Sequence, residues 1–128
     1  MTLAVKTHSR TELVDITGEV QAAVREAGIR EGLCMIYVPH TTAAVTINEN
    51  ADPTVKDDIL KILNKVIPWD DGYRHLEGNS AAHIKSTLVG ASELVAVSGG
   101  KLQLGTWQGI FFCEFDGPRR RKVHLRFV

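Results

Sequence analysis

The chain has 128 residues, with fifteen basic and fifteen acidic side chains and a formal charge of zero at pH 7. This length fits one domain, residues 1–128, which can bury a sufficient hydrophobic core without disulfides or a structural metal. The zero net charge argues against nucleic acid or a membrane surface as partner. Neither a signal peptide nor an apolar run of the roughly 20 residues that span a bilayer is present, which predicts a cytoplasmic protein.

The first third of the chain shows strand and helix patterns in turn. Apolar and polar residues alternate over residues 3–7, which predicts a half-buried strand, and residues 13–16 form a second extended piece. A helix begins at Thr17, where the apolar spacing becomes helical, and ends at Gly28, which suits a left-handed cap. The apolar run LCMIYV at residues 33–38 predicts a strand buried on both faces.

The middle of the chain contains the clearest helix. The alternating segment AAVTIN at residues 43–48 predicts a strand that precedes it. Asp52 supplies an N-cap oxygen and Pro53 a first helical residue, and apolar side chains mark one helix face over residues 55–66. Pro68 ends this helix.

A polar, glycine-punctuated loop follows at residues 69–78 and carries His75. Asn79 or Ser80 then caps a short helix that runs to residue 89. His83 lies in its first turns, so the loop and the helix bring the two histidines into one unit.

The last third predicts two hairpins. ELVAVS and KLQLG flank Gly99-Gly100, which tolerate the positive φ angles of a two-residue turn. A second hairpin joins residues 110–115 and 123–127 through an Asp-Gly-Pro turn. The order of elements predicts an α+β fold, a compact single domain with a mainly antiparallel sheet and helices packed on it. The strand order is not predicted.

Three of the five histidines lie at boundaries between elements, where functional sites collect. His40 follows a predicted buried strand, His75 lies in the polar loop and His83 near a helix start. Three neutral imidazoles with an open fourth position suit a divalent metal, zinc first, although spacing alone is a weak signal without an HExxH-type pair. His8 and His124 lie among basic residues on predicted solvated faces and receive no role.

Charged residues near turns are further candidates. Glu49 suits a general base beside a metal-bound water, whereas Asp52 is explained by its capping role. In the basic run after the Asp-Gly-Pro turn, Arg119 and Arg121 share one face of a strand and match phosphate oxygens in bidentate fashion. Glu114 precedes the turn and can face the same pocket. The alternative for this run is a solvated edge kept from aggregating by charge.

Other common motifs are missing. The sequence has no nucleophile elbow, Walker loop or Rossmann fingerprint, which argues against covalent and nucleotide-switch mechanisms. Cys34 and Cys113 each lie inside an apolar run, where a thiol usually behaves as a small buried hydrophobe.

Three long motifs resemble one known family. HTTAAVTINENADPTV at residues 40–55, HLEGNSAAHIKSTLVG at 75–90 and LQLGTWQGIFFCEFDGPRRRKV at 102–123 closely resemble, in this order, the secondary thiamine-phosphate synthase family. The resemblance implies a compact α+β homotrimer with sites close to subunit boundaries and a metal held by His40, His75 and His83. The polar positions that match the family's motifs are Asn48, Glu49, Asn50, Asn79, Gln108, Glu114 and Arg119.

The implied activity joins a pyrimidine methyl diphosphate to a thiazole phosphate, as a main or a side activity. In this interpretation the metal and Arg119, aided by Arg121 or Lys85, neutralise the departing pyrophosphate, so charge stabilisation drives the reaction. One alternative is a metal-dependent hydrolase of a small phosphorylated metabolite, with Glu49 or Glu114 as the base. Another is a trimeric protein that binds such a metabolite or a metal without converting it.

Overall fold

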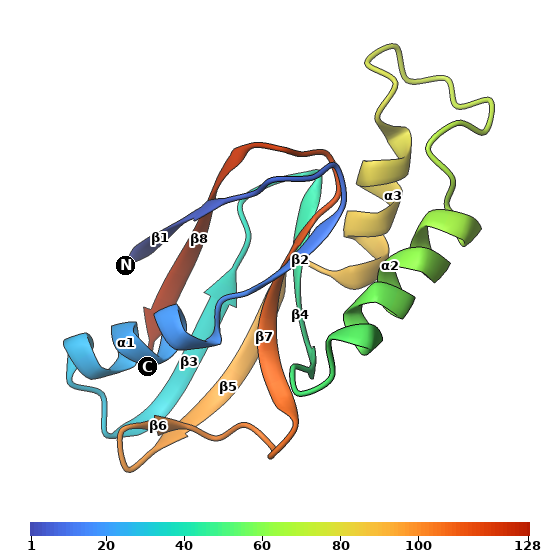
Figure 1. Cartoon of the computed structure of the whole chain (residues 1–128). Coiled ribbons are helices and arrows are strands. Elements are labelled where there is room, and N and C mark those ends of the chain that lie inside the picture. Colours follow the sequence, from blue (N-terminus) through green and yellow to red (C-terminus); the bar gives the residue numbers. More distant parts are fainter.

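Eight strands and three helices make up the computed structural model, which describes residues 1–128 (Figure 1). The strands are β1 (Thr2–Lys6), β2 (Glu12–Asp15), β3 (Glu31–Tyr37), β4 (Ala43–Glu49), β5 (Ser92–Ser98), β6 (Lys101–Leu102), β7 (Gln108–Glu114) and β8 (Arg120–Phe127). The helices are α1 (Thr17–Ala27), α2 (Pro53–Val66) and α3 (Ser80–Val89). The α+β class and the single domain are confirmed.

The strands form two antiparallel sheets rather than one. A five-stranded sheet has the order β1-β8-β3-β5-β6 and a three-stranded sheet has the order β2-β7-β4. The predicted second hairpin is therefore wrong, because β7 and β8 pair in different sheets and the turn after Glu114 leads from one sheet to the other. The physical reason is burial: β7 is buried on both faces and belongs in the middle of the molecule, whereas β8 alternates and has one face in solvent.

The main core lies between the two sheets. It contains apolar side chains from both sheets and from α1, among them Val20, Val24, Ile36, Val45 and Phe112. A second core lies on the other face of the three-stranded sheet, which α2 and α3 cover (Figure 1). The three-stranded sheet is thus the middle layer of the domain.

The outer face of the five-stranded sheet is open, contrary to the sequence prediction for residues 33–38. β3 is buried on one face only, because its other face has no covering layer. Leu33, Met35 and Tyr37 point outward beside Leu94 of β5, which is 61% exposed. An apolar outer face, defined by these four side chains, therefore remains in solvent.

Local signals placed the helices correctly. Gly28 adopts the predicted left-handed conformation with φ 70° after α1. The Asp52 side chain accepts a hydrogen bond from the Thr54 N–H at 2.9 Å, and Pro53 begins α2. None of the three helices combines the length and apolar character needed to cross a bilayer.

Both cysteines are free and buried, as predicted. Burial raises the pKa of the Cys34 thiol to about 11. It raises that of Cys113 to about 12, with a smaller contribution from Glu93. Neither thiol is therefore an activated nucleophile at neutral pH.

Candidate functional site

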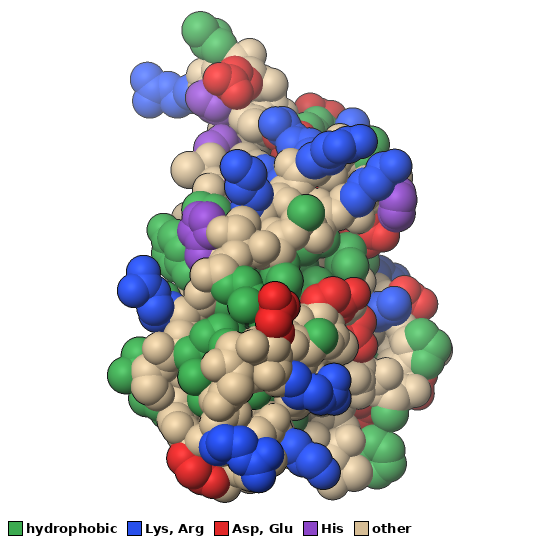
Figure 2. Space-filling model, turned by 90° about the vertical axis from the view of Figure 1, so that its left-hand side faces the viewer, with side chains coloured by type: hydrophobic (Ala, Val, Ile, Leu, Met, Phe, Trp, Pro, Cys, Tyr) green, Lys and Arg blue, Asp and Glu red, His purple; other side chains and the backbone are tan.

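A polar cavity of about 440 Å³ opens where the N-terminus of α3, the start of β4 and the turn before β8 meet. We call it the His–Arg pocket. Polar and charged residues make up its lining apart from one proline, and its residues are Pro39, His40, Thr41, Thr42, His75, Glu77, Asn79, His83, Arg119 and Arg121. Figure 2 shows histidine side chains gathered along one edge of the molecule, close to Lys and Arg side chains.

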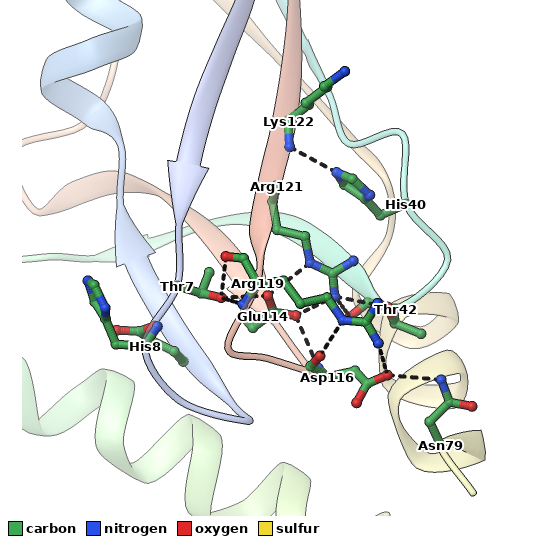
Figure 3. Close-up of polar contacts among 11 residues, drawn as sticks. Thr7, His8, His40, Thr42, Asn79, Glu114, Asp116, Arg119, Arg121 and Lys122 are labelled. Carbon is green, nitrogen blue, oxygen red and sulfur yellow. Dashed lines mark hydrogen bonds and ion pairs between the residues drawn. The ribbon is translucent and has the colours of Figure 1, made fainter. Parts of the chain in front are cut away.

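A buried ion pair forms the wall of this pocket. Arg121, 5% exposed, donates from Nε to Oε1 of Glu114 at 2.9 Å and from Nη2 to Oε2. Nη2 also donates to Oγ1 of Thr42 at 2.9 Å. Thr7 donates to Oε1 of Glu114 at 2.8 Å, so groups from both sheets satisfy the pair (Figure 3). The hydrogen bonds of the Arg121 guanidinium thus come from Nε and Nη2.

The environment of Glu114 keeps it ionised. Burial of this fully buried carboxylate would by itself raise its pKa. Hydrogen bonds from Arg121, Thr7 and the Asp116 N–H outweigh this effect and hold the pKa of Glu114 below its ordinary value. Glu114 is therefore a fixed counterion for Arg121 and a poor general base.

A second polar chain links Arg119 to Asn79. Arg119 donates from Nε to the carbonyl oxygen of Asp116 and from Nη2 to its Oδ2, both at 2.8 Å. Asn79 donates from Nδ2 to the same Oδ2 at 2.9 Å. Asn79 therefore does not cap α3 with its side chain as predicted. Asn79 is only 7% exposed, and its buried Oδ1 has no hydrogen-bond partner.

Asn79, His83 and His75 all line the pocket beside the start of α3. Asn79 and His83 are four residues apart and so lie on the same face of the helix. The ring of His75, from the loop that projects beyond α2 and α3 in Figure 1, meets the ring of His83 edge to face with centroids 5.4 Å apart. Two imidazoles and one unpaired amide oxygen thus share one side of the pocket.

His40 lines the same pocket and accepts a hydrogen bond from the backbone. The Lys122 N–H donates to its Nε2 at 2.9 Å, so Nε2 is the acceptor nitrogen and the neutral ring carries its proton on Nδ1 (Figure 3). Burial and the neighbouring Arg121 lower the pKa of His40, which favours this neutral form. As placed, His40 offers the pocket an N–H donor.

The three histidines predicted to hold zinc do not form one cluster within this chain. The structure brings together no group of three His, Cys, Asp or Glu side chains that could hold a metal ion. Nε2 of His40 accepts a hydrogen bond from the Lys122 N–H, whereas the rings of His75 and His83 pack against each other. Metal binding by His40, His75 and His83 stays a prediction.

Four predicted site residues lie away from the pocket within one chain. Asn48 and Glu49 end β4 and Asn50 follows it, whereas His40 precedes it, so the seven-residue strand places them about 20 Å from His40. Gln108 pairs with Glu49 across β4 and β7, and its side chain accepts a hydrogen bond from the Gly105 N–H. This end of the sheet is a separate polar cluster.

Lys85 also lies outside the pocket. It is 1% exposed and donates to Oδ1 of Asn64 at 2.6 Å, so it joins α3 to α2. Burial, followed by the charge of Arg10, lowers the pKa of Lys85. The predicted contact of Lys85 with pyrophosphate has no support in this position.

Several residues in and around the pocket were missed from the sequence. Thr42 lines the pocket and, with Thr7 behind it, binds the Glu114–Arg121 pair, and Asp116 joins Arg119 to Asn79. The only sequence signal was proximity, since Thr42 lies two residues after His40 and Asp116 lies two residues after Glu114. A polar residue at that distance from a candidate site residue is too common to have identified them.

Comparisons with known proteins identify the family. The model of the family described as UPF0047 protein YjbQ-like matches residues 1–128. UPF0047 protein YugU of Bacillus subtilis is 56% identical over 128 residues, which cover 99% of this chain and 97% of that protein. A UPF0047 protein of Methanocaldococcus jannaschii is 56% identical over 124 residues, covering 97% and 90%.

Solved structures agree. A YjbQ/UPF0047 family protein of Clostridium acetobutylicum has a TM-score of 0.98 and 51% identity, with 100% of this chain and 99% of that chain covered. A YbjQ-like protein of unknown function from Sulfolobus solfataricus has a TM-score of 0.95 and 37% identity, covering 99% and 94%.

The predicted membership of the secondary thiamine-phosphate synthase family is therefore wrong. The family model and the relatives bear UPF0047 names, and none of these names states a thiamine-phosphate activity. The predicted transferase activity on thiamine precursors rested on that resemblance and is therefore wrong as well. Over its whole length, this chain belongs to the YjbQ-like family of UPF0047 proteins.

Proposed function

We propose that the His–Arg pocket binds a divalent metal ion together with a small oxyanion such as a phosphate group. The observation that supports this proposal best is that the paired rings of His75 and His83 line one cavity with Asn79, whose buried Oδ1 has no hydrogen-bond partner. A buried acceptor without a donor is unfavourable, and a cation or a ligand N–H or O–H would satisfy it.

The donor set fits a metal of intermediate softness. Neutral imidazole nitrogens and an amide oxygen are ligands that such divalent ions accept. His75 and His83 would supply the nitrogens and Asn79 the oxygen, and a bound ion would supply positive charge for an oxyanion. The Nδ2 bond to Asp116 keeps the Asn79 oxygen turned away from that carboxylate.

The charge balance of the pocket supports an anionic ligand only in the presence of added positive charge. Asp116 already compensates Arg119, and Glu114 compensates Arg121. The arginines therefore contribute oriented N–H donors more than net charge. A metal beside them would make the pocket positive, so oxyanion binding should require the metal.

Arg119 provides the test of oxyanion binding. Arg119→Ala should weaken phosphate binding by about tenfold in the presence of Co²⁺, because it removes a charged donor from the pocket lining. Arg120→Ala is the matched control, since Arg120 is exposed outside the pocket and should change the affinity less than twofold. Calorimetric titration of phosphate with and without Co²⁺ measures both effects. Equal losses in both variants, growing at low salt, would indicate diffuse attraction and contradict the proposal.

We also propose that the chain associates with copies of itself through the apolar outer face, as the predicted homotrimer would require. An uncovered row of large apolar side chains on a sheet is typical of an interaction surface. Leu94→Glu should reduce the mass measured by light scattering toward that of one chain, because it places a charge in the centre of this face. The far-ultraviolet circular dichroism spectrum should stay unchanged, since Leu94 is exposed in the single chain and its replacement leaves the core intact. A wild-type protein of single-chain mass at micromolar concentration would contradict this proposal.

A further inference from the structure

A second cavity, of about 420 Å³, adjoins the His–Arg pocket. His40, Thr41 and His83 line both cavities and form the boundary between them. Beyond this boundary the second cavity is lined by Ser86 and Thr87 of α3 and by Gly90 and Ala91 before β5. We call it the Ser86 cavity.

The two cavities differ in chemistry. The His–Arg pocket contains two guanidinium groups and Glu77, whereas the Ser86 cavity contains no Arg, Lys, Asp or Glu. Hydroxyl groups and small side chains dominate it. Such a lining suits a neutral group that forms hydrogen bonds and does not suit a second charge.

Ser86 carries an unsatisfied hydroxyl. A helical Ser or Thr ordinarily bonds the carbonyl four residues earlier, as Thr87 does with the oxygen of His83 at 2.9 Å. Oγ of Ser86 is buried and has no such partner. It and Oδ1 of Asn79 are the two buried side-chain polar atoms of the chain without a hydrogen bond, and each belongs to a residue that lines one of the two cavities.

We propose that the two cavities hold the two ends of one small ligand, an oxyanion ester of a hydroxylated carbon chain. The oxyanion would occupy the His–Arg pocket and a neutral hydroxyl group would pair with Ser86. This inference rests on the proposed function, because it takes oxyanion binding in the His–Arg pocket as its starting point. The inference adds the chemical class of the ligand, and it makes Ser86 the residue that recognises the hydroxyl group of that ligand.

The test compares three probes in the presence of Co²⁺: inorganic phosphate, n-propyl phosphate and glycerol 3-phosphate. Wild type should bind glycerol 3-phosphate more tightly than propyl phosphate. Ser86→Ala should weaken the binding of glycerol 3-phosphate by about threefold to tenfold, the usual effect of one lost hydrogen bond. The affinity for inorganic phosphate should change by less than about twofold. Ala91→Leu should cause the same selective loss by filling the cavity. Ser92→Ala, exposed on β5, is the matched control and should change nothing.

The possible failures are distinguishable. If inorganic phosphate binds but glycerol 3-phosphate binds no better than propyl phosphate, the ligand class is wrong and the proposed function stands. If no probe binds, the proposed function fails and the extended site fails with it. If Ala91→Leu changes the mass in light scattering while all affinities stay constant, the Ser86 cavity seats another chain, which also overturns the proposal.

Discussion

Glu114→Ala should lower the free energy of unfolding by about 3–5 kcal/mol, because it leaves the buried guanidinium of Arg121 without its counterion. For a domain of this size the melting temperature should fall by roughly 10–20 °C. Urea denaturation gives the free energy directly. This is the largest stability effect that we expect from a single change in the pocket wall.

The matched control removes both charges. Glu114→Leu combined with Arg121→Met should recover most of the loss, since apolar groups of similar volume avoid the cost of an unpaired buried charge. Equal losses in the single and double variants would show that the uncompensated charge is not the cause.

The same pair makes stability depend on pH. The pKa of Glu114 in the folded chain lies below its ordinary value of 4.5, so its contribution is fully present above that value and is lost as the pH falls through the folded pKa. Wild type should therefore lose stability more steeply below about pH 4.5 than the double variant. Denaturation curves between neutral and acid pH measure the difference, and parallel curves would contradict it.

His83→Ala should abolish most Co²⁺ binding, with a loss of affinity of about a hundredfold or more, because it removes one of two imidazoles that share a face of the pocket. The visible absorption of Co²⁺ in a nitrogen- and oxygen-containing site gives the readout without any assumption about activity. Asn79→Leu should also weaken binding, since it removes the unpaired oxygen.

Two histidine controls make this experiment specific. His124→Ala should leave Co²⁺ binding unchanged, because His124 is exposed on β8 outside the pocket. His40→Ala separates two views of the site: retained metal supports the N–H donor role of His40, and lost metal supports the three-histidine site predicted from the sequence. Unchanged Co²⁺ binding in the His83 variant would remove the metal site altogether.

The ends of the helices could be predicted from the sequence, whereas the pairing of the strands could not. Gly28 and Asp52 were placed correctly because a cap depends on a few neighbouring residues. The assignment of β7 and β8 to different sheets depends on partners far away in the chain, such as β1 and β4. The continuous apolar run of β7 beside the alternating pattern of β8 was the one available clue.

The same reasoning applies to the candidate site. The sequence put Arg119 and Arg121 on one side, and both line the pocket, although Arg119 lies just before β8. Glu49 is near His40 in sequence, but the length of β4 separates them. The unpaired oxygen of Asn79 depends on Asp116, 37 residues later, so no local pattern could indicate it.

The turn that leads from β7 to β8 has a consequence for how the domain opens. Glu114 belongs to the three-stranded sheet and Arg121 to the five-stranded sheet, and their ion pair joins the two sheets beside the pocket. The sheets cannot separate there without exposing both charges. Backbone amides around this junction, such as that of the buried Phe115, which donates to the Thr42 carbonyl, should therefore exchange with solvent deuterium only when the whole domain unfolds. The projecting loop that carries His75 can exchange through local fluctuations.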